Sequence, residues 1–206
     1  MPTIDHSVLT GTEIHEPKGA DTATVNQVYV ADGAGTGSWK TAWNSWWWNY
    51  DHSVTTPVAL TSGVKTDIDN DTAGPASLDF NKLPTATGIW DASTNSFDWA
   101  AGGLSLGDEC FMRIDIDFIT SSNNDGFLLE IDLAHGHAGE INLPILEVNL
   151  DTAGTHEIIA LFRVFLGNSD IASEPAKLSI TADSGADSYV LNGFYISAEP
   201  TNPVYV

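Results

Sequence analysis

Strict alternation of apolar and polar residues in the second half of the chain limits its fold more than any other feature. In FMRIDIDFI at 111–119, every second residue from Met112 to Phe118 is apolar, and charged residues stand between them. A period of two is typical of a strand with one buried face. Turn residues SSNNDG follow, and FLLEIDL at 127–133 repeats the alternation. The two segments are therefore predicted to form a hairpin.

Short apolar segments separated by turn residues continue towards the C-terminus and predict an all-β fold. About eight strands at this spacing are typical of an antiparallel β-sandwich, and specifically of a jelly roll. The segment HEIIALFRVFL could also form a helix, but its β-branched and aromatic residues favour a strand buried on both faces. The further strands are expected at 143–150, 156–166, 177–182 and 189–199, with weaker ones at 76–80, 88–91 and 95–99.

The composition changes along the chain and predicts three parts. Residues 1–40 are rich in Gly, Ala and Thr and are expected to form an extended attachment arm. Residues 41–75 hold most of a tryptophan cluster and are expected to be a connecting segment, and 76–206 are expected to form the sandwich.

The charge balance excludes several classes of partner. With 28 acidic against 7 basic residues, the net charge is −21, which disfavours both nucleic acids and anionic membrane surfaces. No apolar run approaches the roughly 20 residues that a membrane-spanning helix needs, and the start MPTIDHSVLTGTEIHE resembles no signal peptide. The single cysteine, Cys110, excludes an intrachain disulfide and is expected to be a small buried residue.

Motifs of common enzyme families are absent from the sequence. Two carboxylate pairs, Asp115/Asp117 and Glu130/Asp132, have a spacing that glycosidases could use. Each pair, however, lies on the polar face of its own strand, where wet carboxylates keep ordinary acidity. We therefore expect no catalytic residue, no cofactor and no enzymatic activity.

Two patterns could bind a metal ion, although an exposed loop is the simpler interpretation of both. His135-x-His137 could present two imidazoles with Glu140 nearby. The run Asp67-Ile-Asp69-Asn-Asp71 resembles the start of a calcium loop but lacks the later glycine and bidentate glutamate. We therefore predict no metal site from the sequence.

Five of the seven tryptophans lie within ten residues, in WKTAWNSWWWNY at 39–50. The aromatic residues at 39, 43, 46 and 50 are spaced by 4, 3 and 4 residues, which would form a stripe on a helix. On a strand, Trp46, Trp48 and Tyr50 would instead share one face. So many exposed rings would promote aggregation. They must be covered by the domain itself, by another subunit or by a stacked sugar.

The segments IHEPKGADTA at 14–23 and QVYVADGAGTGSWK at 27–40 carry a resemblance. They resemble an N-terminal segment, HEPKGA…VYVADGAGSGxW, that recurs in virion structural proteins of tailed bacteriophages, over about 30 of the 206 residues. These proteins include capsid decoration (cement) proteins, head fibres and tail appendages, and their decoration and fibre-tip domains are often trimeric jelly rolls.

The resemblance implies a non-enzymatic decoration protein that binds the major capsid protein, forms a homotrimer and stabilises the phage head. A head- or tail-fibre protein that recognises host glycans is the alternative. Assembly in the host bacterial cytoplasm and location on the virion surface would follow. The residues expected to contact a partner are His15, Pro17, Tyr29, Trp39, Trp43, Trp46, Trp47 and Trp48.

Overall fold

Two compact units make up the chain, and a computed structural model describes residues 23–32, 37–71 and 83–206. The larger unit covers 44–202, and the smaller combines residues up to 43 with 203–206.

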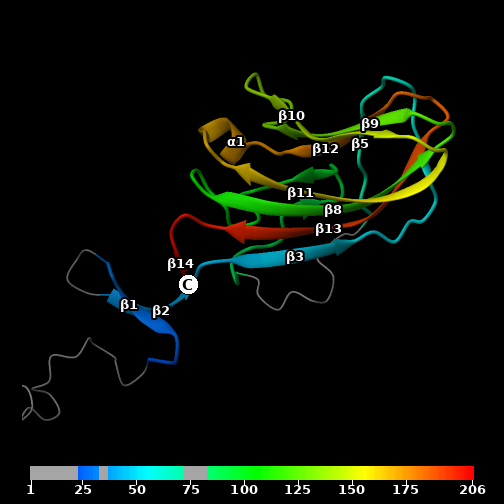
Figure 1. Cartoon of the computed structure of the whole chain (residues 1–206). Helices are drawn as coiled ribbons and strands as arrows, with labels where there is room; N and C mark the ends of the chain where they lie inside the picture. The colour runs from blue at the N-terminus through cyan, green and yellow to red at the C-terminus, as the bar shows by residue number, and fades with distance from the viewer. Residues whose placement is uncertain (1–22, 33–36, 72–82) are drawn as a thin grey trace, which may run out of the picture. The chain divides into compact units, whose positions relative to one another are not determined.

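The larger unit is an antiparallel β-sandwich of two layers, visible as an upper and a lower sheet in Figure 1. One sheet has the order β10-β9-β12-β5, and the other has the order β11-β8-β13-β3, with β4 added to β13. The strands are β3 (Trp46–Asp51), β4 (Val58–Ala59), β5 (Thr66–Asp67), β8 (Glu109–Thr120), β9 (Asp125–Leu133), β10 (Ile141–Leu150), β11 (Gly154–Phe165), β12 (Lys177–Ala182) and β13 (Ser188–Glu199).

The strand order confirms the predicted jelly roll. Apart from β4, the eight strands of the two sheets follow the nested pattern of paired Greek keys. The first strand pairs with the last, β3 with β13, and the second with the second to last, β5 with β12. Only the middle pair, β9 and β10, joins neighbours in the sequence within one sheet.

The predicted alternation also places the core. The apolar residues of β8 from Met112 to Phe118 are fully buried between the sheets, and those of β9 face them from the other sheet. Phe118 stacks on Phe127, with ring centroids 4.5 Å apart. Burying each such side chain contributes about 1.5–3 kcal/mol. The two segments lie in opposite sheets, so they form a corner between layers instead of the predicted hairpin.

The segment HEIIALFRVFL is a strand, as expected, but our prediction that it is buried on both faces is wrong. It lies in β11 at the edge of its sheet, and Ile159, Leu161 and Phe165 are more than half exposed. The apolar content of this strand therefore reflects an exposed apolar face in addition to the core.

The sandwich begins earlier in the chain than residue 76. Strands β3 and β5 belong to the segment 41–75, and they complete the two sheets as edge strands. The short hairpin of β6 (Trp90–Asp91) and β7 (Ser96–Phe97) replaces the weak strands expected at 88–91 and 95–99. The strand expected at 76–80 lies outside the described residues.

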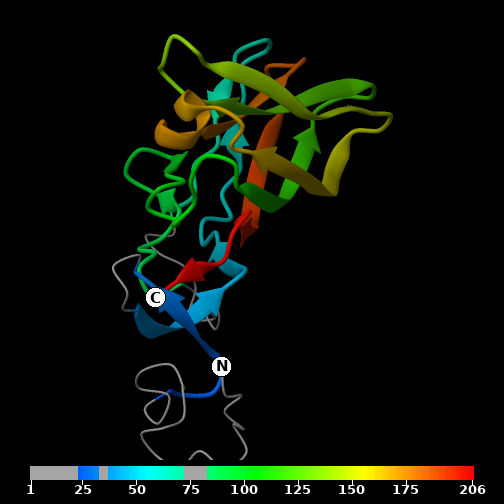
Figure 2. The ribbon, with the colours of Figure 1, turned by 90° about the vertical axis from the view of Figure 1, so that its left-hand side faces the viewer.

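The single helix within the described ranges, α1 (Ser169–Ser173), interrupts the loop between β11 and β12. The Asn168 side chain caps it by accepting a hydrogen bond from the Ile171 backbone N–H at 2.9 Å. Both ribbon views show α1 beside the turn that joins β9 to β10 (Figures 1 and 2).

The smaller unit contains a three-stranded antiparallel sheet made from both ends of the described chain. Strands β1 (Gln27–Ala31), β2 (Gly37–Trp43) and β14 (Val204–Tyr205) have the order β1-β2-β14. Tyr29 and Trp39 face each other across β1 and β2, and their rings meet edge to face at 5.5 Å.

Candidate functional site

The tryptophan-rich strand β3 presents alternate residues to opposite sides, as the strand interpretation predicts. Trp46, Trp48 and Tyr50 are fully buried inside the jelly roll, whereas Trp47 is partly exposed on the outer side. Trp46 and Trp48 therefore cannot contact a partner in the folded protein, which corrects the role expected for them. They fill the core because β3 packs one complete face against the interior.

The other residues expected to contact a partner belong to the smaller unit. Tyr29, Trp39 and Trp43 lie on its β1 and β2 and are all partly exposed. His15 and Pro17 lie outside the described residues.

A hollow of about 500 Å³ opens on the outer face of the sheet β11-β8-β13-β3. It lies where Gly193 occupies an outward-facing position between Asp115 of β8 and Asp51 of β3. The sheet needs glycine there, because a Cβ would lie 2.6 Å from the Tyr50 carbonyl oxygen and φ is +150°. The missing side chain leaves a gap in the outward-facing row.

A bulge beside the glycine adds a polar group to this hollow. The register of β13 shifts between Leu191 and Gly193, so Asn192 is an extra residue on the strand. Its side-chain amide lines the hollow and donates to Asp117 Oδ1 at 3.2 Å.

Aromatic rings and charged groups share the walls of the hollow. Phe111 and Tyr195 line it with Asn49, Asp51 and Arg113. Arg113 donates twice to Asp115, from Nε at 2.8 Å and from Nη2 at 2.7 Å. Burial and the charge of Glu199 raise the pKa of Tyr195. The arrangement offers flat apolar faces beside fixed donors and acceptors.

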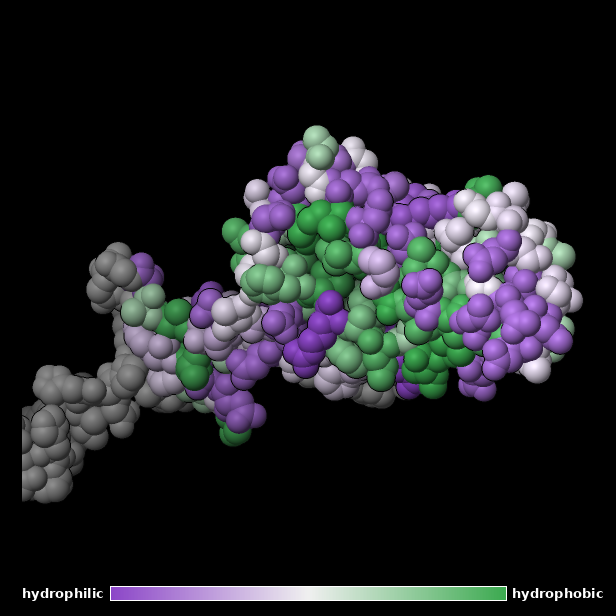
Figure 3. Space-filling view, turned by 45° about the horizontal axis from the view of Figure 1, so that its top comes forward, coloured by the Kyte–Doolittle hydropathy of each residue, from purple (hydrophilic) through white to green (hydrophobic). Residues whose placement is uncertain are grey.

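A second exposed feature is a set of large apolar side chains on the two edge strands β10 and β11. Figure 3 shows hydrophobic side chains gathered over the middle of the sandwich and hydrophilic ones around them. The large exposed apolar residues of these strands are Ile141, Leu143, Ile159, Leu161 and Phe165.

One of the two carboxylate pairs is not wet, which corrects our expectation. Asp132 is only 3% exposed, and Glu130 is also largely covered. Lys65 lies 2.5 Å from Asp132 Oδ1 and 3.5 Å from Glu130 Oε2. Burial lowers the pKa of Lys65, but the hydrogen bond and charge of Asp132 outweigh it and raise the pKa overall.

The carboxylates of the calcium-like run have separate partners. Asp67 pairs with Lys177 at 2.7 Å. Asp71 accepts from the Ser53 hydroxyl and backbone, and lies 2.9 Å from His52. These two carboxylates are thus engaged in different contacts.

Cys110 is fully buried in β8, as the sequence predicted. Burial, with a smaller effect from Glu199, raises the pKa of its thiol far above the ordinary value. The thiol is therefore unreactive in the folded protein.

The two histidines of the β9–β10 turn point to different neighbours. His137 Nδ1 lies 3.6 Å from Asp170 of α1. His135 instead lies beside Glu140 and Asp132, and ligand atoms of these three residues are all within 4.8 Å of one another. The sequence suggested His135 and Glu140, but it placed Asp132 in a different pair.

Comparison with known proteins identifies no family for this chain. No family model matches it, and no curated protein matches it. Solved structures similar to it share the β-rich fold at low identity. Eiger TNF from S. frugiperda has a TM-score of 0.44 and 11% identity, over 78% of this chain and 94% of that one.

Two further similar structures have a TM-score of 0.39. Infectious bursal disease virus, Gx strain, is 10% identical over 82% of this chain and 37% of that one. The CBM22-1 xylan-binding domain from Paenibacillus barcinonensis is 8% identical over 75% of this chain and 94% of that one. Scores this low carry no argument about function, and the three proteins differ in what they do.

No helix in the described parts of the chain has the length and apolar character to cross a bilayer.

Proposed function

We propose that this chain is a non-enzymatic virion structural protein, a capsid decoration protein that binds the major capsid protein and stabilises a phage head. The observation that carries the proposal is the N-terminal resemblance at 14–23 and 27–40. A jelly roll joined to a small separate sheet is compatible with this role, since the larger unit can remain folded while the smaller one engages a partner.

The smaller unit has features that suit attachment. Among the described residues, β1 and β14 form the two edges of its sheet, and an exposed strand edge can accept a strand from a partner. Val25, Val28 and Tyr205 expose apolar surface on the same unit. A capsid protein that adds a strand there would bury these side chains.

Self-association forms the second part of the proposal. The outward-facing apolar residues of β11, Ile159, Leu161 and Phe165, would be the contact between copies of a homotrimer, because cyclic symmetry lets one surface cover its own copies. A second copy is the expected occupant because the exposed residues of β11 are mainly apolar. Arg163, which lies among them, pairs with Glu109 at 2.9 Å and with Glu199 at 3.1 Å in its own chain.

Copy number on particles tests the decoration role. We expect hundreds of copies of the full chain per particle on a stained gel of purified virions. A few to tens of copies would contradict decoration and support an appendage.

Light scattering of two variants tests the trimer. Leu161→Glu should convert trimer to monomer, because it places a charge in the apolar contact. Thr155→Glu adds the same charge at the end of the same exposed face and should leave the trimer intact. A monomeric parent protein, in solution and on the particle, would refute this part.

The hollow beside Gly193 favours a second candidate, a fibre protein that recognises host glycans. Sugars stack their apolar faces on aromatic rings and bond their hydroxyls to fixed polar groups, and the hollow offers Phe111 and Tyr195 beside Asn49 and Asp51. A glycan array would test it. Tyr195→Ala should abolish glycan binding. Trp47→Ala, which changes a ring outside the hollow, should leave both the fold and the binding intact. This pair of results would support the glycan role.

A further inference from the structure

We propose that Asp132, His135 and Glu140 form a binding site for one divalent transition-metal ion such as Zn²⁺. This inference is independent of the proposed virion role, because it depends only on the turn between β9 and β10. The three residues supply one imidazole and two carboxylates, a donor set that suits Zn²⁺ and Mn²⁺ better than Ca²⁺.

The backbone brings the three ligands together from a short stretch of chain. Asp132 lies near the end of β9, His135 lies in the turn, and Glu140 directly precedes β10. Ala134 and Gly136 both have positive φ, so the chain reverses sharply on each side of His135. The His135 backbone N–H donates to the Pro175 carbonyl at 2.7 Å, which holds the turn against the loop before β12.

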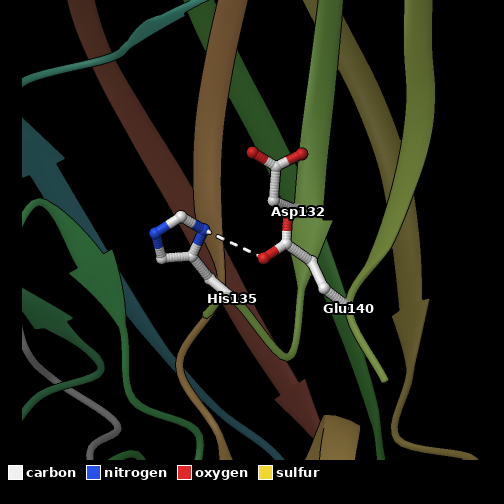
Figure 4. Close-up of side chains that lie close together, drawn as sticks. All are labelled: Asp132, His135 and Glu140. Carbon is white, nitrogen blue, oxygen red and sulfur yellow. Dashed lines mark ion pairs between the residues drawn. The ribbon is translucent and has the colours of Figure 1, made fainter. Parts of the chain in front are cut away.

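Figure 4 shows one ring nitrogen of His135 directed at the carboxylate of Glu140, with the Asp132 carboxylate beside it. His135 Nδ1 and Glu140 Oε2 are 3.6 Å apart, which is too long for a hydrogen bond. Two ligand atoms on a tetrahedral zinc ion are about 3.4 Å apart. This spacing therefore fits a shared ion better than a direct bond.

The imidazole nitrogen is the observation that points to a ligand. Among the described residues, His135 Nδ1 is buried and has no hydrogen-bond partner. Leaving a buried polar atom without a partner is energetically costly, so native proteins rarely do so. A metal ion between Nδ1 and the two carboxylates would satisfy it.

Neighbouring groups hold the carboxylates in place. The Gly136 backbone N–H donates to Glu140 Oε2 at 2.7 Å. In the orientation that satisfies its hydrogen bonds, the Asn142 amide donates to Glu140 Oε1 at 3.2 Å and to Asp132 Oδ1 at 2.6 Å. Such outer contacts orient ligands around bound metals.

The charge around the cluster favours a divalent cation. Asp132, Glu140 and the adjacent Glu130 carry three negative charges, and Lys65 contributes one positive charge. The remaining two negative charges would be balanced by one divalent ion. The site is also reachable, since the His135 and Glu140 side chains are 36% and 30% exposed.

Calorimetric titration of the chelator-treated full chain with Zn²⁺ tests the site. We expect one ion per chain with a Kd of about 10 µM or tighter, and Co²⁺ should bind there with the visible absorption of a nitrogen- and oxygen-bound ion. His135→Asn and Glu140→Gln should each weaken Zn²⁺ binding at least tenfold. Circular dichroism should show that both variants remain folded.

Two further variants separate this site from general binding to an acidic surface. His137→Asn alters a histidine two residues away that faces Asp170, and it should leave binding unchanged. Lys65→Met removes the ammonium that competes for Asp132, and it should tighten binding. Weak binding at several sites, or binding that His135→Asn leaves unchanged, would overturn the proposal.

Discussion

The hydroxyl oxygen of Tyr50 accepts a hydrogen bond from the backbone N–H of Ile89 at 3.0 Å. It also accepts from the next backbone N–H, that of Trp90, at 3.2 Å. The edge strand β3 is thereby joined to the loop before the short β6–β7 hairpin. Because Trp90 is the first residue of β6, one side-chain oxygen satisfies one buried donor of the loop and one of the hairpin.

Replacement of this oxygen should be costly although it removes only one atom. Tyr50→Phe leaves two buried N–H groups without their acceptor, and we expect a loss of about 1–3 kcal/mol in the free energy of unfolding. Urea denaturation followed by fluorescence measures it. Tyr195→Phe, at a partly exposed tyrosine, is the matched control and should change the free energy of unfolding by less than about 0.5 kcal/mol.

Adjacent tryptophans on β3 should respond very differently to truncation. Trp46 is fully buried and its indole N–H donates to the Gly102 carbonyl at 2.9 Å, so Trp46→Ala should cost about 3–5 kcal/mol. Trp47→Ala removes a partly exposed ring and should cost distinctly less. Equal losses in denaturant midpoints would show that alternation does not control the energetics of this strand.

The close approach of β13 to β3 should make Gly193 irreplaceable. Gly193→Ala adds a Cβ that meets the Tyr50 carbonyl and strains a positive φ, and we expect a loss of about 1–3 kcal/mol. Gly63 also has a positive φ but has open space around it. Gly63→Ala therefore isolates the backbone strain, and thermal denaturation should show it to be the milder change.

Acid should remove one identifiable contribution to stability. Hydrogen bonds from the Ser53 hydroxyl and backbone, with the charge of His52, lower the pKa of Asp71 below its ordinary 3.8. A carboxyl group whose pKa is lower in the folded than in the unfolded protein stabilises the folded state at pH values above its unfolded pKa. This stabilisation is lost as the pH falls through the pKa of the folded state.

The melting temperatures of the parent protein and Asp71→Asn measured from pH 6 to pH 2.5 should therefore converge as the pH falls below 3.8. A gap that stays constant over this range would contradict the assignment to Asp71.

Periodicity predicted the strands that the structure contains between 109 and 199, because each has a face that must be buried. The spacing of residues carries no information on which strands pair. The expected hairpin of 111–119 with 127–133 is consequently a connection between sheets. Burial of 156–166 on both faces was wrongly predicted from exposed apolar residues such as Leu161, since hydrophobicity does not distinguish a core from an exposed edge.

The candidate sites were harder to predict than the strands. The hollow at Gly193 depends on a bulge at Asn192 and on pairing with β3, and neither leaves a periodic signal. The Asp132–His135–Glu140 cluster did have a local signal, an acid at the end of an alternating strand followed by a histidine in a turn. The cluster was not predicted because Asp132 was expected to be a solvent-exposed surface residue.

The pairing of β3 with β13 has a consequence for biosynthesis. Trp48 lies opposite Ile196, so this part of the core cannot close until residue 196 has left the ribosome, on the order of ten seconds after β3 is made. During that interval the nascent chain exposes Trp46 and Trp48 to solvent. Pairing between segments so distant in sequence is also slow. Production of this protein should therefore depend on chaperones that shield the tryptophan-rich strand until β13 arrives.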